Sequence, residues 1–185
     1  NSFEKGKENY QKWESIYAQH PLKNEFNKQI ERNITKHIKS LLMDYKKDQV
    51  LAKTSMATRK SSQQVLNVLM ENCSFLLSGS ADLAGACYTK SQNAQPISKS
   101  NYNGNYINYG IREHAMGAIM NGLAVHGGFV PLSSTFLSFV DYMKPAVRLA
   151  SLMEEQEIYV LTHDSLGVGE DGPTHQPIEQ LASLR

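Results

Sequence analysis

The sequence predicts an α/β fold in which a parallel sheet is flanked by helices and preceded by a helical linker. Two observations support this prediction. After about residue 54, short apolar runs typical of buried strands alternate with longer stretches of helical periodicity, and such alternation is typical of parallel strands. Before that point the chain is rich in Lys, Glu, Asn and Gln, and its apolar residues recur at helical spacing. We therefore expect a linker over residues 1–53 and an α/β domain over residues 54–185.

The linker is expected to form two amphipathic helices. His20-Pro21 separates them, because the residue before a proline is disfavoured in the helical region. Either a peripheral arm or a connection between two domains fits such solvated helices. Their apolar positions are Trp13, Ile16, Tyr17, Ile30, Ile34, Ile38, Leu41 and Leu42.

The α/β domain is expected to contain four strands and four main helices. Strands are predicted over residues 75–77, 106–109, 129–132 and 158–162, and helices over residues 58–71, 112–126, 136–152 and 176–185. Loops are predicted over residues 79–85 and 88–105, because Gly, Ser, Asn and Gln are frequent there. Parallel strands end at one edge of a sheet, where open α/β proteins bind ligands. The four loops that follow the strands should therefore meet there.

Composition excludes several classes of function. The net charge of the 185-residue chain is +1, which gives no basic field for nucleic acid or an anionic membrane. The longest apolar stretch, residues 115–130, is too short and too polar to span a bilayer. The chain has two cysteines, Cys73 and Cys87, which are too few for a disulfide framework. This low number fits a protein of a reducing compartment. We expect a cytoplasmic protein without a nucleic-acid or membrane partner.

The segment from His163 to Pro177 is the strongest candidate for a functional loop. Within thirteen residues it holds two histidines, three acids and three glycines, directly after the predicted strand 158–162. Histidines there can carry protons near neutral pH, although a tight turn with solvated side chains would show the same composition. His163, His175 and Asp171 lack a further ligand for a metal ion, so we expect no metal site. Nucleotide-binding loops of the Gly-x-x-x-x-Gly-Lys-Ser/Thr and Gly-x-Gly-x-x-Gly types are absent from the sequence.

Glu113 stands at the predicted start of a helix and is followed by apolar residues. A carboxyl group in such surroundings is suited to share a proton with a ligand nitrogen. The alternative, favoured by the sequence alone, is that Glu113 caps the helix and stabilises its dipole.

Three further features each have a structural and a functional interpretation. Phe136, Phe139 and Tyr142 recur every three residues and would form either core or a flat wall for a heteroaromatic ring. Asp82 could be an ordinary turn residue. Arg59 could be solvated at a helix start or could pair with a phosphate.

Five stretches together resemble the transketolase family in order and spacing. They are Ala57-Thr-Arg-Lys60, Gly79-Ser-Ala-Asp-Leu83, Gly110-Ile-Arg-Glu-His-Ala-Met116, Ser134-Thr-Phe-Leu-Ser-Phe139 and the segment His163–Pro177. The resemblance implies that residues 54–185 form most of a pyrimidine-binding domain of the thiamine diphosphate-binding fold, incomplete at its C-terminus. It also implies that residues 1–53 are a linker from a missing diphosphate-binding domain. Because the chain begins at Asn1 and ends at Arg185 within a predicted helix, we expect a fragment of a longer polypeptide.

The resemblance also implies cofactor roles for particular residues. Glu113 matches the glutamate that hydrogen-bonds N1′ of the thiamine aminopyrimidine ring, which favours the tautomer that removes the thiazolium C2 proton. The family's aromatic residues around the pyrimidine are matched by Phe136, Phe139 and Tyr142. Its two residues near the thiazolium are matched by Asp82 and Leu83.

At the substrate end, His163, Asp171 and His175 match residues that bind sugar hydroxyls, and the histidines also match residues that assist proton transfer. Arg59 matches an arginine that grips the substrate phosphate. Ala86 departs from the pattern, since many transketolases have a serine there that also holds the phosphate.

The implied reaction is transfer of a two-carbon ketol unit from xylulose 5-phosphate to ribose 5-phosphate or erythrose 4-phosphate in the pentose phosphate pathway. Mg²⁺ or Ca²⁺ would be held mainly by the missing domain, in a Gly-Asp-Gly run that Glu170-Asp-Gly172 does not match. The family builds each site between the two subunits of a homodimer, so this chain alone would be inactive. The alternatives are dihydroxyacetone synthase and a non-catalytic dimerisation or regulatory module.

Overall fold

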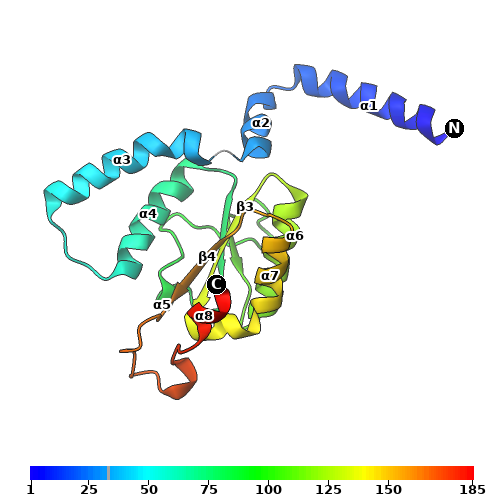
Figure 1. Ribbon diagram of the computed structural model, residues 1–185. Helices are drawn as coiled ribbons and strands as arrows, with labels where there is room; N and C mark the ends of the chain where they lie inside the picture. Colours follow the sequence, from blue (N-terminus) through cyan, green and yellow to red (C-terminus); the bar gives the residue numbers. More distant parts are fainter. Residues whose placement is uncertain (33) are drawn as a thin grey trace.

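A parallel sheet forms the centre of the molecule (Figure 1). The computed structural model describes residues 1–32 and 34–185, with the side chains of residues 34–37 outside the described part. Its four strands are β1 (Leu76–Ser80), β2 (Tyr106–Asn108), β3 (Val130–Phe136) and β4 (Ile158–Thr162). They lie in the order β2-β1-β3-β4, and every neighbouring pair is parallel. The predicted fold class is confirmed.

Helices precede, connect and follow these strands. The α-helices are α1 (Ser2–Gln19), α2 (Lys23–Glu31), α3 (Ile34–Ala52), α4 (Thr58–Asn72), α5 (Ala84–Cys87), α6 (Glu113–His126), α7 (Lys144–Leu152) and α8 (Gln180–Leu184). Two 3-10 helices, η1 (Leu137–Tyr142) and η2 (Pro173–His175), follow β3 and β4.

The linker prediction was wrong in the number of helices. His20 is extended and ends α1, as its position before Pro21 predicts. A second break follows at Arg32, which adopts a left-handed conformation with φ 47°. The helical spacing of apolar residues continues across this break, so the pattern alone did not reveal it.

The predicted helix over residues 136–152 was also wrong at its start. Strand β3 continues to Phe136, because Ser134–Phe136 pair with Val160–Thr162 of β4. A 3-10 helix then precedes α7. Smaller differences concern α5, which occupies part of the predicted loop 79–85, and α8, which is shorter than predicted.

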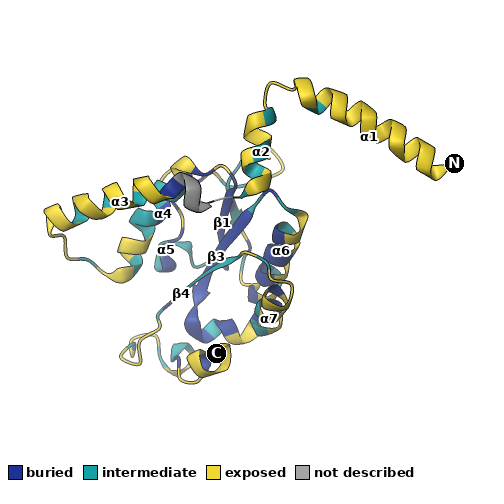
Figure 2. Ribbon diagram, turned by 45° about the horizontal axis from the view of Figure 1, so that its top comes forward, coloured by how far each residue is buried: buried dark blue, intermediate teal, exposed yellow. Residues whose placement is uncertain are grey.

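The two faces of the sheet carry separate cores. One cluster joins α3 and α4 to the sheet through Ile38, Leu66, Met70, Leu76 and Leu132. The other joins α6, η1 and α7 to the opposite face, and its buried members are Ala81, Tyr109, Met116, Met120, Leu137, Val140, Met143 and Ala146. Figure 2 shows the buried positions concentrated on β1, β3 and α6. This three-layer packing holds the strand ends, and therefore the loops that follow them, in fixed positions.

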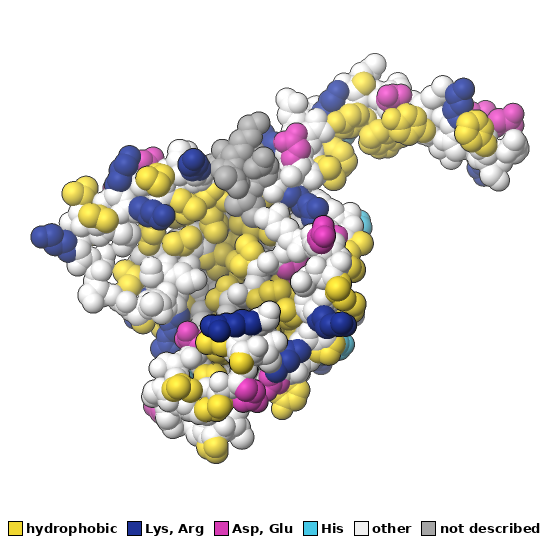
Figure 3. Space-filling model, viewed as in Figure 1, with side chains coloured by type: hydrophobic (Ala, Val, Ile, Leu, Met, Phe, Trp, Pro, Cys, Tyr) yellow, Lys and Arg dark blue, Asp and Glu magenta, His cyan; other side chains and the backbone are white. Residues whose placement is uncertain are grey.

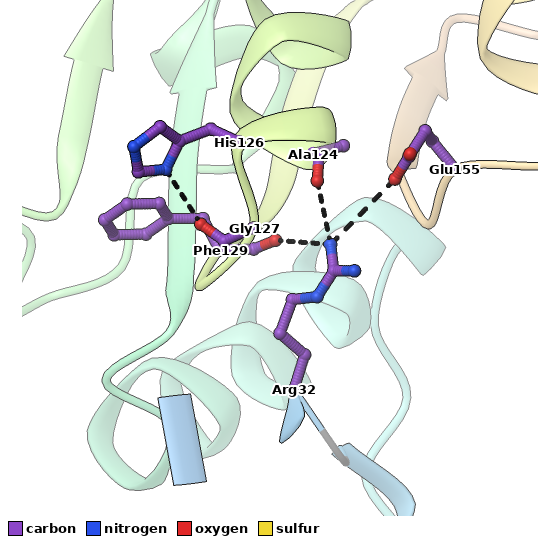
Figure 4. Close-up of polar contacts among 6 residues, drawn as sticks. All are labelled: Arg32, Ala124, His126, Gly127, Phe129 and Glu155. Atoms are coloured by element: carbon purple, nitrogen blue, oxygen red, sulfur yellow. Dashed lines mark hydrogen bonds and ion pairs between the residues drawn. The ribbon is translucent and has the colours of Figure 1, made fainter. Parts of the chain in front are cut away.

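The Arg32 side chain connects the helices of residues 1–53 to the α/β domain by hydrogen bonds (Figure 4). Its Nη1 donates to the carbonyl oxygen of Ala124 at 3.0 Å and to that of Phe129 at 3.4 Å. The Glu155 carboxylate lies 4.0 Å away. A cation is favourable at this place because Ala124 is in the last turn of α6, where the helix dipole is negative.

By contrast, α1 extends away from the domain (Figures 1 and 3), and none of its residues is buried. Its aromatic residues stack in a row, with Trp13 and Tyr17 rings 4.9 Å apart. Phe26 of α2 meets the Tyr17 ring edge-on at 5.8 Å. Across residues 1–32 and 34–185, none of the helices combines the length and apolar composition that a membrane crossing requires.

Replacing Gly79 of β1 by Ala is expected to destabilise the domain. An added Cβ would lie 2.3 Å from Cε2 of Tyr109 and 2.8 Å from the backbone oxygen of Ile107, and the Tyr109 ring is buried in the core. Such overpacking costs about 1–3 kcal/mol. Gly85→Ala is the matched control, because no atom lies within 4 Å of its added Cβ, and it should change stability by less than about 0.5 kcal/mol. Denaturant unfolding measures both, and equal midpoints for the two variants would contradict the prediction.

Candidate functional site

Apart from Arg59, which lies at the start of α4, the candidate residues lie at the carboxyl ends of the strands or on the segments that follow them. Ser80, Phe136 and Thr162, which end β1, β3 and β4, lie close in register, with Ser80 opposite Ser134 and Phe136 opposite Thr162. The loop with Asp82, the helix η1 and the segment from His163 therefore start at one edge of the sheet. The start of α6, with Glu113, follows β2 at the same edge.

Glu113 is buried at the first residue of α6, with 8% of its surface exposed. The hydroxyl of Thr135, which is fully buried in β3, donates to its Oε1 at 3.3 Å. The N-cap residue is Arg112, and its side chain makes no capping hydrogen bond. The carboxylate is thus turned to the sheet edge, while its place in the first turn also suits the helix dipole.

The aromatic residues form a continuous wall with the two histidines. Phe136 ends β3 and is the N-cap of η1, which contains Phe139 and Tyr142. Because residues three apart lie above one another in a 3-10 helix, the three aromatic residues follow one another in a row. The rings of Phe136 and Phe139 are 5.8 Å apart and nearly parallel, and Tyr142 lies 6.3 Å from Phe139. His163 packs on Phe136 at 3.8 Å, and His175 packs on Phe139 at 5.0 Å. Phe136 is buried whereas Tyr142 is mostly exposed, so the wall runs from the interior to the surface.

A cavity of about 860 Å³ brings together three of the four predicted substrate-binding residues. Arg59, His163 and Asp171 line it, together with Glu170 and backbone of the glycine-rich loop. The Arg59 Nη1 donates to the Ala86 carbonyl oxygen at 3.3 Å and lies 3.4 Å from Nε2 of His163. Its guanidinium also lies over the Tyr88 ring at 5.3 Å. His175 is not among the lining residues of this cavity and belongs to the aromatic wall beside it.

The surroundings of His163 disfavour its charged form. Burial lowers the pKa of this imidazole below its ordinary value, and the positive charge of Arg59 lowers it further. Asp171 and Asp164 raise it and His175 lowers it, with smaller effects than burial. The net direction is downward, so the ring is neutral at neutral pH and can accept a proton.

Asp82 and Leu83 are placed at the sheet edge but not against the other candidates. Asp82 has a left-handed backbone, with φ 64°, and is exposed. The backbone N–H of Leu83 donates to Ser80 Oγ at 3.0 Å, which holds the turn. Among the described residues, the Asp82 side chain makes no hydrogen bond, so its role near a thiazolium stays a prediction.

Sequence reasoning missed three residues that support the site. Thr135 holds Glu113. Thr162 contacts both His163 and Cys87 through its hydroxyl. The one available signal was position, because Thr135 and Thr162 directly precede Phe136 and His163 at the ends of their strands.

No group of three or more His, Cys, Asp or Glu side chains is arranged to hold a metal ion in the part of the chain that the structure describes. The buried carboxylate and the flat aromatic wall fit a heteroaromatic ring, and the Arg59 cation fits an anionic group.

Comparison with known proteins agrees with this geometry. Residues 54–185 match the family described as transketolase, pyrimidine binding domain. The chain is 48% identical over 163 residues to the transketolase of Sinorhizobium medicae, covering 88% of this chain and 24% of that protein. For transketolase 2 of Vibrio vulnificus the identity is 52% over 131 residues, covering 71% and 20%.

Solved structures give the same result. The transketolase of Pichia stipitis in complex with sedoheptulose 7-phosphate superposes with a TM-score of 0.84 at 37% identity, covering 98% of this chain and 28% of that chain. The Campylobacter jejuni transketolase gives 0.80 at 38% identity, covering 96% and 26%. The chain thus spans about a quarter of the length of its relatives. On this evidence the chain belongs to the transketolase family, and its residues 54–185 are a pyrimidine-binding domain.

Proposed function

We propose that this chain supplies the pyrimidine-binding half of a transketolase active site. The observation that carries the proposal is the buried Glu113 carboxylate at the carboxyl edge of the sheet. It accepts a hydrogen bond from Thr135, the residue before Phe136, where the aromatic wall begins. The reaction would transfer a two-carbon ketol unit from xylulose 5-phosphate to ribose 5-phosphate or erythrose 4-phosphate.

The residues present fit the pyrimidine end of thiamine diphosphate. Burying a carboxylate is costly unless a partner compensates it, and among the described residues Glu113 forms no ion pair within 4.0 Å and accepts one hydrogen bond from a side chain, that of Thr135. An N–H of a pyrimidine ring would supply the missing partner, and Phe136, Phe139 and Tyr142 would border the flat ring. When bound, this cofactor supplies the electron sink for breaking and forming the carbon–carbon bond. Glu113 would orient the ring and hold a proton at its nitrogen.

At the other end of the site, Arg59 would bind the substrate phosphate. Its guanidinium presents several donors in a fork that suits phosphate. His163 and Asp171 line the same cavity and would hydrogen-bond sugar hydroxyls, with His175 near the aromatic wall. The bound sedoheptulose 7-phosphate in the Pichia stipitis relative supports a sugar phosphate as the ligand class.

The remaining parts would come from outside this chain. Mg²⁺ or Ca²⁺ and the cofactor diphosphate would be held by a diphosphate-binding domain, connected through residues 1–53. The exposed aromatic row of α1 gives such a domain a surface to contact. A second subunit would complete each site in a homodimer. The two cysteines are free and buried, which is compatible with a cytoplasmic location.

Ketol transfer by the full-length protein tests the proposal. Thiamine diphosphate and Mg²⁺ would be added, and sedoheptulose 7-phosphate would be followed from xylulose 5-phosphate and ribose 5-phosphate. Product formation supports the proposal. A protein that binds the cofactor but forms dihydroxyacetone from a one-carbon acceptor would be a dihydroxyacetone synthase, and a protein that binds no cofactor would be a non-catalytic module.

A further inference from the structure

The glycine-rich segment His163–Pro177 is held at its ends and not along its length. Between Asp164 and Asp171 nearly all residues are exposed, so few contacts fix the loop there. The far end is anchored, because η2 and α8 both pack against η1. Pro177 is buried, and Gln180 is only 4% exposed. The position of His175 in η2 therefore depends on the part of the chain that follows it.

The Gln180 side chain joins this part of the chain to η1. Its Nε2 donates to Oδ2 of Asp141 at 3.0 Å, and its Oε1 accepts from the backbone N–H of Ile178 at 2.8 Å. The other carboxylate oxygen of Asp141 lies 2.6 Å from Nζ of Lys144. The amide of Gln180 thus bridges two segments that lie 39 positions apart in the sequence, and both of its ends are used.

A second contact between the same two segments lies beside this bridge. The His175 ring meets the Phe139 ring edge-on, with the centroids 5.0 Å apart. Phe139 comes shortly before Asp141, and His175 comes shortly before Ile178. Nδ1 of His175 lies 2.8 Å from the hydroxyl of Thr174. Because Thr174 is its neighbour in the chain, that contact cannot fix the ring relative to η1.

We propose that Gln180 and Asp141 are positioning residues, which hold the His175 imidazole against the aromatic wall and so keep it on the sugar-binding side of the site. A hydrogen bond to a carboxylate generally contributes more than one edge-on ring contact. Without the bridge, the exposed loop before η2 would let His175 move away from Phe139. This inference rests on the proposed function, because that function assigns His175 to the sugar hydroxyls.

The donors and acceptors of the bridge can be exchanged to test it. Gln180→Glu would place two carboxylates next to each other, and like charges repel. In Asp141→Asn the new amide has one oxygen for two donors, Gln180 and Lys144, so two donors would face each other. In the double variant the new amide at position 141 can donate to the new carboxylate at position 180, while its oxygen still accepts from Lys144. The backbone N–H of Ile178 keeps an acceptor in the double variant.

Hydrogen exchange, followed by mass spectrometry on the full-length protein, tests the bridge independently of activity. Gln180→Glu and Asp141→Asn should each speed amide exchange in the peptide of residues 173–180 about tenfold, the equivalent of one hydrogen bond. The double variant should return exchange to the wild-type rate. Gln92→Glu is the matched control, since it makes the same chemical change in an exposed turn, and it should leave this peptide unchanged.

Kinetics then test whether the bridge acts through His175. Gln180→Glu should lower kcat/KM about tenfold, and equally with xylulose 5-phosphate and unphosphorylated xylulose, because both donors carry the sugar hydroxyls. In a His175→Gln protein the same change should cost nothing further, because the effects of residues that act as one unit are not additive. Adding Asp141→Asn to Gln180→Glu should restore the activity.

The outcomes separate this inference from the proposed function. Exchange in Gln180→Glu equal to that of the wild type would overturn the inference, and so would a double variant that exchanges as fast as the single variants. A further tenfold loss in the His175→Gln protein would show that Gln180 acts on something other than His175. A wild-type protein without ketol transfer would contradict the proposed function, while the exchange rates would still show whether the bridge holds η2.

Discussion

Glu113→Gln is expected to lower the rate of ketol transfer by the full-length protein at least about 100-fold, the low end for loss of a positioned proton-transfer group. The substitution keeps the shape of the side chain and leaves an amide oxygen that can still accept from the Thr135 hydroxyl. It removes the negative charge that would hold a proton at a ring nitrogen. The loss should therefore appear in kcat, with the fold and the surrounding wall preserved.

Glu157→Gln provides the matched control for this change. Glu157 is also partly buried, and burial raises the pKa of its carboxyl group. It precedes β4, at the amino end of the sheet and far from the loops of the site. The same chemical change there should leave ketol transfer near the wild-type rate. Equal losses in the two variants, or full activity of Glu113→Gln, would contradict the role proposed for Glu113.

The position of the site could be predicted from the sequence because it depends on local patterns. Glu113 and His163 each follow a strand that is recognisable from its apolar residues. In a parallel sheet this order of elements is enough to place both at the carboxyl edge. Of the two helix breaks in the linker, only the first was predictable, because Pro21 marks it. The second, at Arg32, is made by a left-handed residue that is not a glycine.

The supporting contacts were not predictable, because they join a strand to a helix or strand far from it in the sequence. Phe136 fitted a helical stripe, but pairing with Thr162 of β4 makes it the last residue of β3. Thr162 meets Cys87 across 75 positions of sequence. A count of cysteines could indicate a reducing compartment, yet it could not show that Cys87 lies behind a histidine of the site. The roles of Asp82, Leu83 and Tyr142 stay predictions from the family resemblance.

Arg59→Leu is expected to lower kcat/KM for phosphorylated donors about 30-fold to 100-fold. Among the described residues no carboxylate lies within ion-pair distance of Arg59, although its side chain is half-buried against Ala86 and Tyr88. A cation held in this way is available for an anionic ligand. Removing one partner of a buried charge pair costs about 2–5 kcal/mol. We use the lower end of that range because the cavity is open to water.

The choice of substrate makes this prediction specific to the phosphate. With xylulose 5-phosphate the loss should appear mainly as a higher KM, whereas unphosphorylated xylulose should be used about equally by the wild type and Arg59→Leu.

Lys60→Leu is the control, since Lys60 also lies over the Tyr88 ring, at 5.9 Å, but is exposed at the surface. It should lower kcat/KM at most a few-fold, as expected for an exposed charge. Ala86 offers no side-chain hydroxyl beside Arg59, so Arg59 should carry more of the phosphate binding here than in relatives with a serine. If both donors lost activity equally in Arg59→Leu, the arginine would be acting through His163, which its Nη1 also contacts, and not through the phosphate.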